Sequence, residues 1–353
     1  MNIVYSAPSR LTYDILENAT LRNSPMVQQL CLELGGFLVS NMFYRAFISI
    51  QIMECIIGLI ALPMVHYGYL VKAALHINLK ALLSLYFHIC IVYAVIILTC
   101  RMYEAVLWLS YRNPCDIFPS RGAYHFYAVM EMYCLMHMIS LQLVVGFERV
   151  VATIFVHTYE SWKRTSPLFI FATFIFPGAV TLWIYHDVEF VEPNLSCFTD
   201  QTAVKLKVDF ISVLVILFGL VGLTVQSILA NINKKRTARL IDKPLTVRYQ
   251  LSENIAGTTL TSYLQLSQVL ATIVFSAMML ACSEVHLGLI ENERDINYII
   301  KEGVYVIPLA VAILPFLTRH LLKKRQIRRN NLIQQSVLQP TSVYSVMLEQ
   351  QWK

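Results

Sequence analysis

Seven apolar stretches, separated by polar segments, constrain the fold of this chain more than any other feature of its sequence. An α-helix needs about 20 mostly apolar residues to cross the roughly 30 Å hydrocarbon core of a bilayer. We place the seven stretches at Phe47–Tyr69, Leu79–Cys100, Tyr124–Phe147, Leu168–Tyr185, Val208–Ile232, Thr258–Cys282 and Tyr298–Leu317. Only 14% of the residues are charged, against roughly 25% in soluble domains. The sequence therefore predicts an all-α polytopic membrane protein, a bundle of seven transmembrane helices.

The segments outside these stretches divide the chain into three parts. Residues 1–46 form an N-terminal segment, residues 47–317 the seven-helix domain, and residues 318–353 a polar tail. Met26–Ser40 in the first part is amphipathic, so we expect it to lie against the first span or to extend it.

Lysine and arginine residues are unevenly distributed among the connecting segments. If the N-terminus is outside, most of them lie on the inner side, above all in the third inner loop and the tail. The members of these two clusters are Lys234, Lys235, Arg236, Arg239, Lys243 and Arg248, and Arg319, Lys323, Lys324, Arg325, Arg328 and Arg329. Because cytoplasmic loops carry an excess of basic residues, we predict an extracellular N-terminal segment and a cytoplasmic tail.

The same distribution bears on partners. The net charge of +6 belongs to one membrane face, which favours contact with anionic membrane lipids and gives nucleic-acid binding no support. Leu317, Leu321 and Leu322 give the start of the tail a weak apolar face, compatible with a short helix lying on the membrane.

Two features of the predicted outer segments agree with this orientation. The two Asn-x-Ser/Thr sequons, at Asn18 and Asn194, both fall outside, where glycosylation takes place. Cys115 and Cys197 lie in the first and second outer loops, an oxidising setting in which we expect a disulfide between them. Two free thiols are the alternative, and Cys31 competes for either partner.

Glu148 and Arg149 stand at the predicted inner end of the third span. An arginine at a membrane boundary is costly to leave unpaired. Glu148 is its nearest counter-ion, and Glu253, just below the sixth span, is a more distant one. An Arg149–Glu253 pair would hold the third and sixth helices together, and breaking it would open a groove for a partner. In the alternative, Glu253 is a solvated loop carboxylate.

Four short motifs, in order along most of the chain, resemble the nematode serpentine chemoreceptors, which are G-protein-coupled receptors. They are His76-Ile-Asn78-Leu-Lys80, Asn113-Pro-Cys-Asp116, Glu148-Arg-Val-Val-Ala-Thr153 with Tyr159-Glu160, and Arg248-Tyr249-Gln250 with Glu253-Asn254. The Pro-Cys-Asp element points to class alpha/beta or its sibling class alpha, in one superfamily. The Glu-Arg run with Tyr159-Glu160 is shared with class epsilon, the second choice.

The resemblance implies a chemosensory receptor in the plasma membrane of sensory neurons, in their cilia, that binds a small-molecule cue and activates a heterotrimeric G protein. It implies that Glu148, Arg149 and the matching residues of the later motifs couple to that G protein: Tyr159, Glu160, Arg248, Tyr249, Gln250, Glu253 and Asn254. The chain departs from the broad rhodopsin-like pattern, because its sixth span lacks Trp-x-Pro and its seventh lacks Asn-Pro-x-x-Tyr.

Glu131 is the candidate ligand contact. It precedes Glu148 by 17 residues, about 25 Å along a helix, at the depth where amine receptors carry a carboxylate that binds a cationic ligand. Four charged residues near the outer ends of the second and seventh spans could join it, namely Arg101, Glu104, Lys301 and Glu302. In the alternative, Glu131 pairs with Lys301 or Arg101 and only stabilises the bundle.

Other function classes find little support in the sequence. It has no Gly-rich phosphate loop, no Cys-x-x-Cys pair and no His-Glu-x-x-His helix, and no metal-ligand spacing, so we predict neither an enzyme nor a cofactor. A ligand-gated channel or small-solute transporter is the remaining alternative. Transporters typically have internal repeats and broken helices, which are not visible here, although Pro177 and Pro308 are able to kink two spans.

Overall fold

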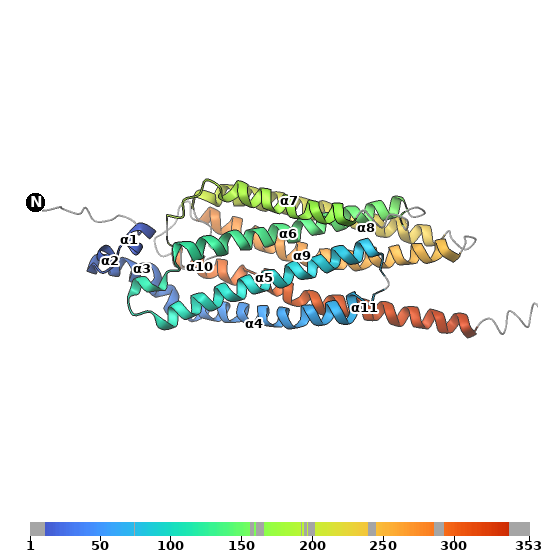
Figure 1. Ribbon diagram of the computed structural model, residues 1–353, viewed down its shortest axis with the longest axis horizontal. Helices are drawn as coiled ribbons and strands as arrows, with labels where there is room; N and C mark the ends of the chain where they lie inside the picture. The colour runs from blue at the N-terminus through green and yellow to red at the C-terminus, as the bar shows by residue number, and fades with distance from the viewer. Residues whose placement is uncertain are drawn as a thin grey trace, which may run out of the picture.

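The computed structural model describes residues 11–73, 75–155, 159, 166–191, 193, 196, 202–238, 245–285 and 293–338. Within these ranges the secondary structure is helical and contains no strand. Seven of the helices are long and apolar enough to cross a membrane. They lie side by side in one elongated bundle (Figure 1), which confirms the predicted seven-helix class.

The spanning helices are longer than the apolar stretches that predicted them. They are α4 (Met42–Val65), α5 (Ile77–Ser110), α6 (Arg121–Ile154), α7 (Ser166–Tyr185), α8 (Thr202–Ala238), α9 (Leu245–Val285), and the pair α10 (Glu293–Val304) and α11 (Ile307–Leu338). A π-helical turn, η1 (His66–Leu70), continues α4. The helices are longer than the apolar stretches because helical backbone hydrogen bonds continue into the polar sequence on either side. Hydropathy predicts only the part of a helix that is buried in lipid.

The seventh span is broken, whereas the sequence had predicted one helix over Tyr298–Leu317. Helix α10 ends at Val304 and α11 begins at Ile307. Pro308 has no N–H to donate to the Val304 carbonyl oxygen, which instead accepts from the Val306 N–H at 2.7 Å. Proline is tolerated in the first turn of the new helix, where an N–H has no helical partner anyway. Pro315 lies inside α11 without ending it.

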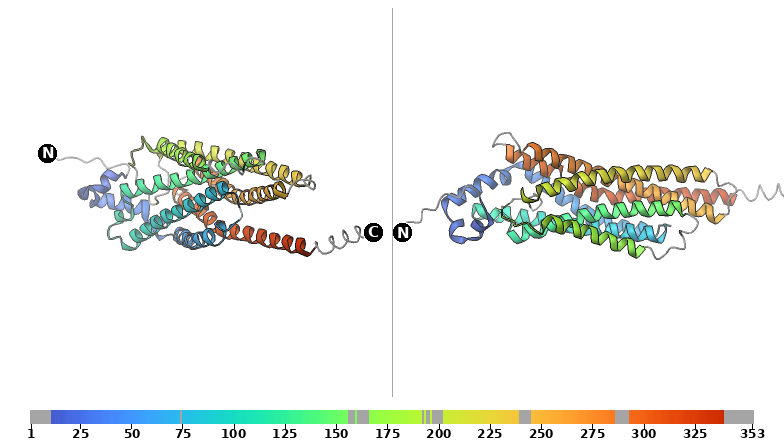
Figure 2. Two further views of the ribbon diagram at one scale, coloured as in Figure 1. Left: turned by 45° about the vertical axis from the view of Figure 1, so that its right-hand side comes forward. Right: turned by 90° about the horizontal axis from the view of Figure 1, so that it is seen from above.

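Helix α11 also differs from the expectation for the start of the tail. It continues without interruption to Leu338, so Leu321 and Leu322 belong to the long helix and not to a separate short one. Leu322 is buried against the core of the bundle. Figures 1 and 2 show α11 projecting past α4 and α5, and we call this end of the bundle the tail end.

Three short helices cover the opposite end, which we call the cap end (Figure 2). They are α1 (Tyr13–Glu17), α2 (Ala19–Arg22) and α3 (Pro25–Ser40). Their buried side chains form one apolar cluster with residues of the bundle, including Tyr124 and Phe190. Helix α3 is a separate element from α4, because the chain leaves the helical conformation at Asn41, whose side chain caps α4.

A disulfide joins the cap to the bundle, and it corrects the expected pairing. Cys31 of α3 bonds to Cys115 of the 3₁₀ turn η2 (Pro114–Ile117), with an S–S distance of 2.04 Å. A sulfur forms only one such bond, so the predicted Cys115–Cys197 disulfide is wrong in this structure. Helix α3 packs against η2 and brings Cys31 within reach, whereas Cys197 lies outside the described residues.

Candidate functional site

A buried ionic cluster lies at the tail end, and we call it the tail-end cluster. Its centre is Glu148 and Arg149 of α6, whose side chains are almost completely removed from solvent. Arg149 donates two hydrogen bonds to the Glu148 carboxylate, one of them from Nε to Oε2 at 2.5 Å. The Tyr159 hydroxyl donates to the same carboxylate. The charge on each member of the pair is therefore satisfied by its neighbour in sequence.

Neutral side chains connect this pair to other helices. Arg149 Nη1 donates to Asn254 Oδ1 of α9 at 3.3 Å, and Asn78 Nδ2 of α5 donates to the Tyr159 hydroxyl at 3.4 Å. These asparagines and the tyrosine hold α5, α6 and α9 together around the ion pair. The tail-end cluster thus comprises Asn78, Glu148, Arg149, Tyr159 and Asn254.

Thr153, at the end of α6, accepts further hydrogen bonds from residues of α8 and α9. Its hydroxyl accepts from Asn233 Nδ2 at 3.2 Å and from Asn254 Nδ2 at 3.3 Å. Its carbonyl oxygen accepts from Arg236 Nη1 at 2.5 Å. The end of α6 is therefore attached to both neighbours by hydrogen bonds.

Gly257 of α9 allows this close packing. A Cβ atom at this position would lie 2.6 Å from Arg149 Nη1 and 3.0 Å from Leu79 Cδ2. Only glycine lets the α9 backbone approach the guanidinium so closely.

The ion pair of Arg149 is with Glu148, and its hydrogen bond to α9 goes to Asn254. The charge of half-buried Glu253 also acts on Arg149, so a direct Arg149–Glu253 pair stays a prediction. Successive residues of an α-helix point about 100° apart, and Asn254 is the one of the two whose side chain is hydrogen-bonded to α6.

Tyr159 lies beyond the membrane-spanning part of α6. Burial, followed by the neighbouring Glu148 carboxylate, raises the pKa of its hydroxyl. The hydroxyl therefore keeps the proton that it donates to Glu148. Of the other predicted coupling residues, Glu160 lies outside the described residues, and Arg248, Tyr249 and Gln250 lie in the first turns of α9, where only the backbone is described.

A second buried ionic cluster, the cap-end cluster, consists of Arg101 and Glu104 of α5 and Glu302 of α10. Arg101 Nη1 donates to Glu104 Oε2 at 2.8 Å and to the Ser196 hydroxyl at 3.2 Å. The Arg101 guanidinium also forms an ion pair with Glu302. Three of the four charged residues expected near Glu131 are thus brought together, and the fourth, Lys301, is half-buried beside Glu302 in sequence.

Glu131 accepts a hydrogen bond from the Tyr305 hydroxyl, which lies in the break between α10 and α11. The Tyr93 hydroxyl lies 2.5 Å from that of Tyr305. Glu131 is 8% exposed, and the Tyr305 hydroxyl contacts the carboxylate that the sequence suggested as a cation site.

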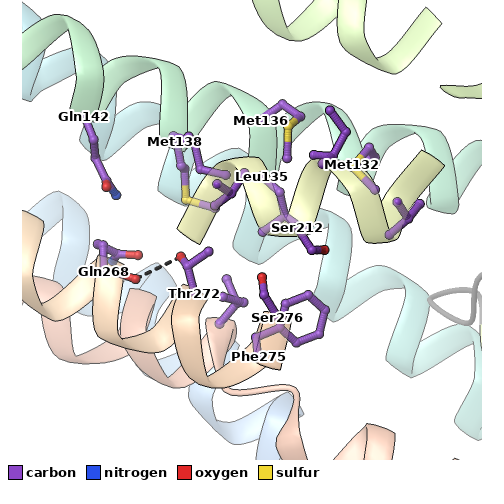
Figure 3. Close-up of a pocket in the computed structure, with 15 residues that line it drawn as sticks. Met132, Leu135, Met136, Met138, Gln142, Ser212, Gln268, Thr272, Phe275 and Ser276 are labelled. Carbon is purple, nitrogen blue, oxygen red and sulfur yellow. Dashed lines mark hydrogen bonds between the residues drawn. The ribbon is translucent and has the colours of Figure 1, made fainter. Parts of the chain in front are cut away.

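A cavity of about 50 Å³ lies between α6, α8, α9 and the first residue of α11 (Figure 3). Its wall is mostly apolar, with Met132, Met136, Met138 and Phe275 among the lining residues. The polar lining residues include Gln142, which donates to the Tyr86 hydroxyl at 3.3 Å, and Thr272, which donates to the Gln268 backbone carbonyl oxygen at 2.9 Å. The cavity was not predicted, because its residues come from four separate stretches of sequence.

Comparison with known proteins shows which family has this seven-helix architecture. The sequence profile of the serpentine type 7TM GPCR receptor class ab chemoreceptors matches residues 36–353. The chain belongs to this family. Two relatives from Caenorhabditis elegans, serpentine receptor class beta-16 and serpentine receptor class beta-17, are each 22% identical to it. The first alignment covers 80% of this chain and 84% of the relative, and the second covers 88% of each.

Membership of a seven-helix receptor family confirms the predicted resemblance and identifies a multi-pass membrane protein. Within the part of the chain that the structure describes, no group of three or more His, Cys, Asp or Glu side chains is placed to hold a metal ion. Sequence reasoning missed Asn233 and Tyr305 as members of the polar networks. Asn78, Thr153 and Asn254 carried a signal, since all three stand within the motifs of the family resemblance.

Proposed function

We propose that the chain is a chemosensory G-protein-coupled receptor. A small-molecule cue binds from the cap end, which faces outward, and a heterotrimeric G protein binds at the tail end, which faces the cytosol. The observation that carries this proposal is the tail-end cluster. It places a buried arginine, fully paired within its own helix, at the junction of α5, α6 and α9.

The geometry supports a two-state device. Separating α9 from α6 breaks the hydrogen bonds that Asn254 makes with Arg149, Ala152 and Thr153, but it leaves the Glu148–Arg149 ion pair intact. The opening therefore needs no unpaired charge in the membrane, and a ligand with greater affinity for the open state shifts the population toward it. The opened groove between α6 and α9 would admit a segment of the G protein, to which Arg149 then becomes accessible.

The ends of the bundle fit the same orientation. Helices α8 and α11 carry Lys234, Lys235, Arg319, Lys323 and Lys324 toward the tail end, where anionic lipid headgroups of the cytoplasmic leaflet would bind them. At the cap end, Asn18 is exposed and uses its Oδ1 to cap α2, which keeps it accessible for glycosylation. Asn194, the other proposed site, lies outside the described residues. Residence in sensory cilia of the plasma membrane belongs to this proposal.

The test is expression in a reporter cell that records G-protein activation during exposure to volatile, amine and acid compounds. Arg149→Ala should abolish any response at unchanged surface density, and an intact response would remove Arg149 from the coupling role. Epitope tags at both termini test the orientation in unpermeabilised cells. An extracellular C-terminus would refute the receptor proposal.

One observation favours a second candidate. The break at Tyr305 and Val306 interrupts the seventh span beside the buried Glu131, and broken helices of this kind bind solutes in transporters. Ion current or solute flux that persists in cells without the G protein would favour the channel or transporter.

A further inference from the structure

Gln268 of α9 stands out among the residues that line the cavity in Figure 3. Its side chain is only 3% exposed, and its Nε2 has no hydrogen-bond partner within the described part of the chain. Buried donors are nearly always paired, because an unmade hydrogen bond leaves the full cost of desolvation uncompensated. The nearby Thr272 hydroxyl donates to the Gln268 backbone carbonyl oxygen but does not accept a hydrogen bond from Nε2. The cavity thus contains a donor that lacks an acceptor.

The remainder of the lining determines what can supply the acceptor. None of the described residues that line the cavity is charged, and most have apolar side chains, such as Met132, Met136 and Phe275. Burying an ionised group here would leave its charge unpaired at a high free-energy cost. Methionine and aromatic side chains instead fit apolar groups of varied shape. The wall therefore disfavours amines and carboxylates and favours a neutral, mostly hydrocarbon molecule.

We propose that this cavity binds a small neutral molecule with one hydrogen-bond acceptor, such as a ketone, aldehyde or ester, whose oxygen accepts from Gln268 Nε2. This inference rests on the proposed receptor function and names the chemical class of its cue. It moves the expected ligand contact from the Glu131 carboxylate, which Tyr305 already contacts, to an amide on α9. Because a water molecule needs roughly 10–15 Å³ of such space, the cavity of about 50 Å³ admits only a molecule of few non-hydrogen atoms without helix movement.

The cavity lies beside the break between α10 and α11 and against α9, the helix that we propose separates from α6. Phe275 lines the cavity and packs edge-on against Tyr305, with ring centroids 5.4 Å apart. Ile307, the first residue of α11, lines it as well. Gln268 lies 14 residues after Asn254 on α9, about 21 Å from the tail-end cluster. A ligand bound to Gln268 thus contacts the same helix that the tail-end cluster holds against α6.

The test uses the full-length protein purified in detergent, with thermal unfolding as the measure of binding. The probes are straight-chain methyl ketones of increasing length, the alkanes of equal length, and the corresponding primary amines. Ketones should raise the unfolding temperature of the wild type more than alkanes do, whereas amines should not. Gln268→Met keeps the size of the side chain and removes its donor, so the ketone affinity should fall by roughly threefold to tenfold, as expected for one neutral hydrogen bond.

The matched control is Gln226→Met. Gln226 is also buried with an unpartnered Nε2 among the described residues, but it is not one of the residues lining this cavity. It should leave the preference for ketones unchanged. Without ligand, Gln268→Met should be at least as stable as the wild type, because it removes an unsatisfied donor.

The outcomes separate the two proposals. Equal ketone affinity in Gln268→Met and the wild type, or no ketone-dependent stabilisation of the wild type, would overturn the assignment of this cavity. Stronger stabilisation by amines would return the ligand site to Glu131. Ketone binding that depends on Gln268, without G-protein activation by ketones in cells, would keep the site and refute the receptor function.

Discussion

The two buried ionic clusters use the same groups, one arginine and neighbouring carboxylates, but they connect the fold differently. In the cap-end cluster the ion pairs of Arg101 run both to Glu104 on its own helix and to Glu302 on α10. In the tail-end cluster the ion pair joins adjacent residues of α6, and only hydrogen bonds to Asn78 and Asn254 reach other helices. The first arrangement has an ion pair between two helices, whereas the ion pair of the second lies within one helix.

This difference sets the free energy of opening each end. Removing one partner of a buried ion pair costs about 3–5 kcal/mol, because the other charge is left uncompensated. Losing a hydrogen bond to a charged group costs about 1.5–3 kcal/mol. Opening between α6 and α9 breaks hydrogen bonds of Asn254, whereas opening between α5 and α10 breaks the Arg101–Glu302 ion pair. We expect the cap end to be a fixed frame and the tail end to be the part that moves.

The largest effect is expected from Arg101→Met, which leaves Glu104 and Glu302 buried without their cation. Unfolding should become easier by about 3–5 kcal/mol, with a matching loss of receptor at the cell surface. The measurement is thermal unfolding in detergent together with surface labelling. Arg121→Ala is the control, since Arg121 pairs with Asp14 on the exposed surface of the cap, where such a pair contributes about 0–1 kcal/mol. Equal losses in the two variants would show that the cap-end cluster is not a special cross-link.

An intermediate effect is expected from Gly257→Ala at the tail end. The added methyl group would meet Arg149 and Leu79, and overpacking of this kind costs about 1–3 kcal/mol. The variant should also push α9 away from α6 and raise ligand-independent signalling. Gly178→Ala on α7 is the matched control, because a Cβ there meets no atom within 4 Å. If both alanine variants resemble the wild type, close approach at Gly257 is unimportant.

The smallest effect is expected from Tyr159→Phe, which removes one hydroxyl between Asn78 and Glu148 and keeps the ring. Stability should fall by about 1 kcal/mol. Burial raises the pKa of Tyr159, so the hydroxyl stays neutral in the folded protein. The difference from the wild type should therefore persist through neutral pH and diminish only as the pH rises above the ordinary tyrosine pKa of about 10.

Tyr103→Phe controls for loss of a tyrosine hydroxyl, since the Tyr103 hydroxyl accepts from the Ser120 N–H at the cap end. It should not alter signalling. A difference between Tyr159→Phe and the wild type that vanishes near neutral pH would contradict the assigned protonation.

Hydropathy and a dipeptide were enough to predict the seven spans and the position of Glu148 and Arg149, since both are local signals. Which residue of α9 hydrogen-bonds to Arg149 depends on the rotation of that helix about its axis, because Glu253 and Asn254 point about 100° apart. The helix boundaries estimated from the sequence do not determine this rotation. The partner of Cys115 depends on how α3 packs against η2, because sequence alone does not determine disulfide connectivity.

The break in the seventh span and the cavity also could not be predicted from local sequence signals. Pro308 was recognised as a possible kink, but a proline also lies within α11 at Pro315 without ending the helix. Gln268 resembles other buried glutamines in sequence, and only packing reveals that it lines a cavity and that its Nε2 lacks a partner among the residues described.

The central claim is that the hydrogen bond from Arg149 to Asn254 holds the tail end closed and that Arg149 itself transmits the signal. The direct measurement is ligand-independent G-protein activation at equal surface density by the wild type, Asn254→Leu, and the double variant Arg149→Ala, Asn254→Leu. We predict that Asn254→Leu raises this basal activity and that the double variant returns it to background. Basal activity that is unchanged in Asn254→Leu, or that stays high in the double variant, would contradict the claim.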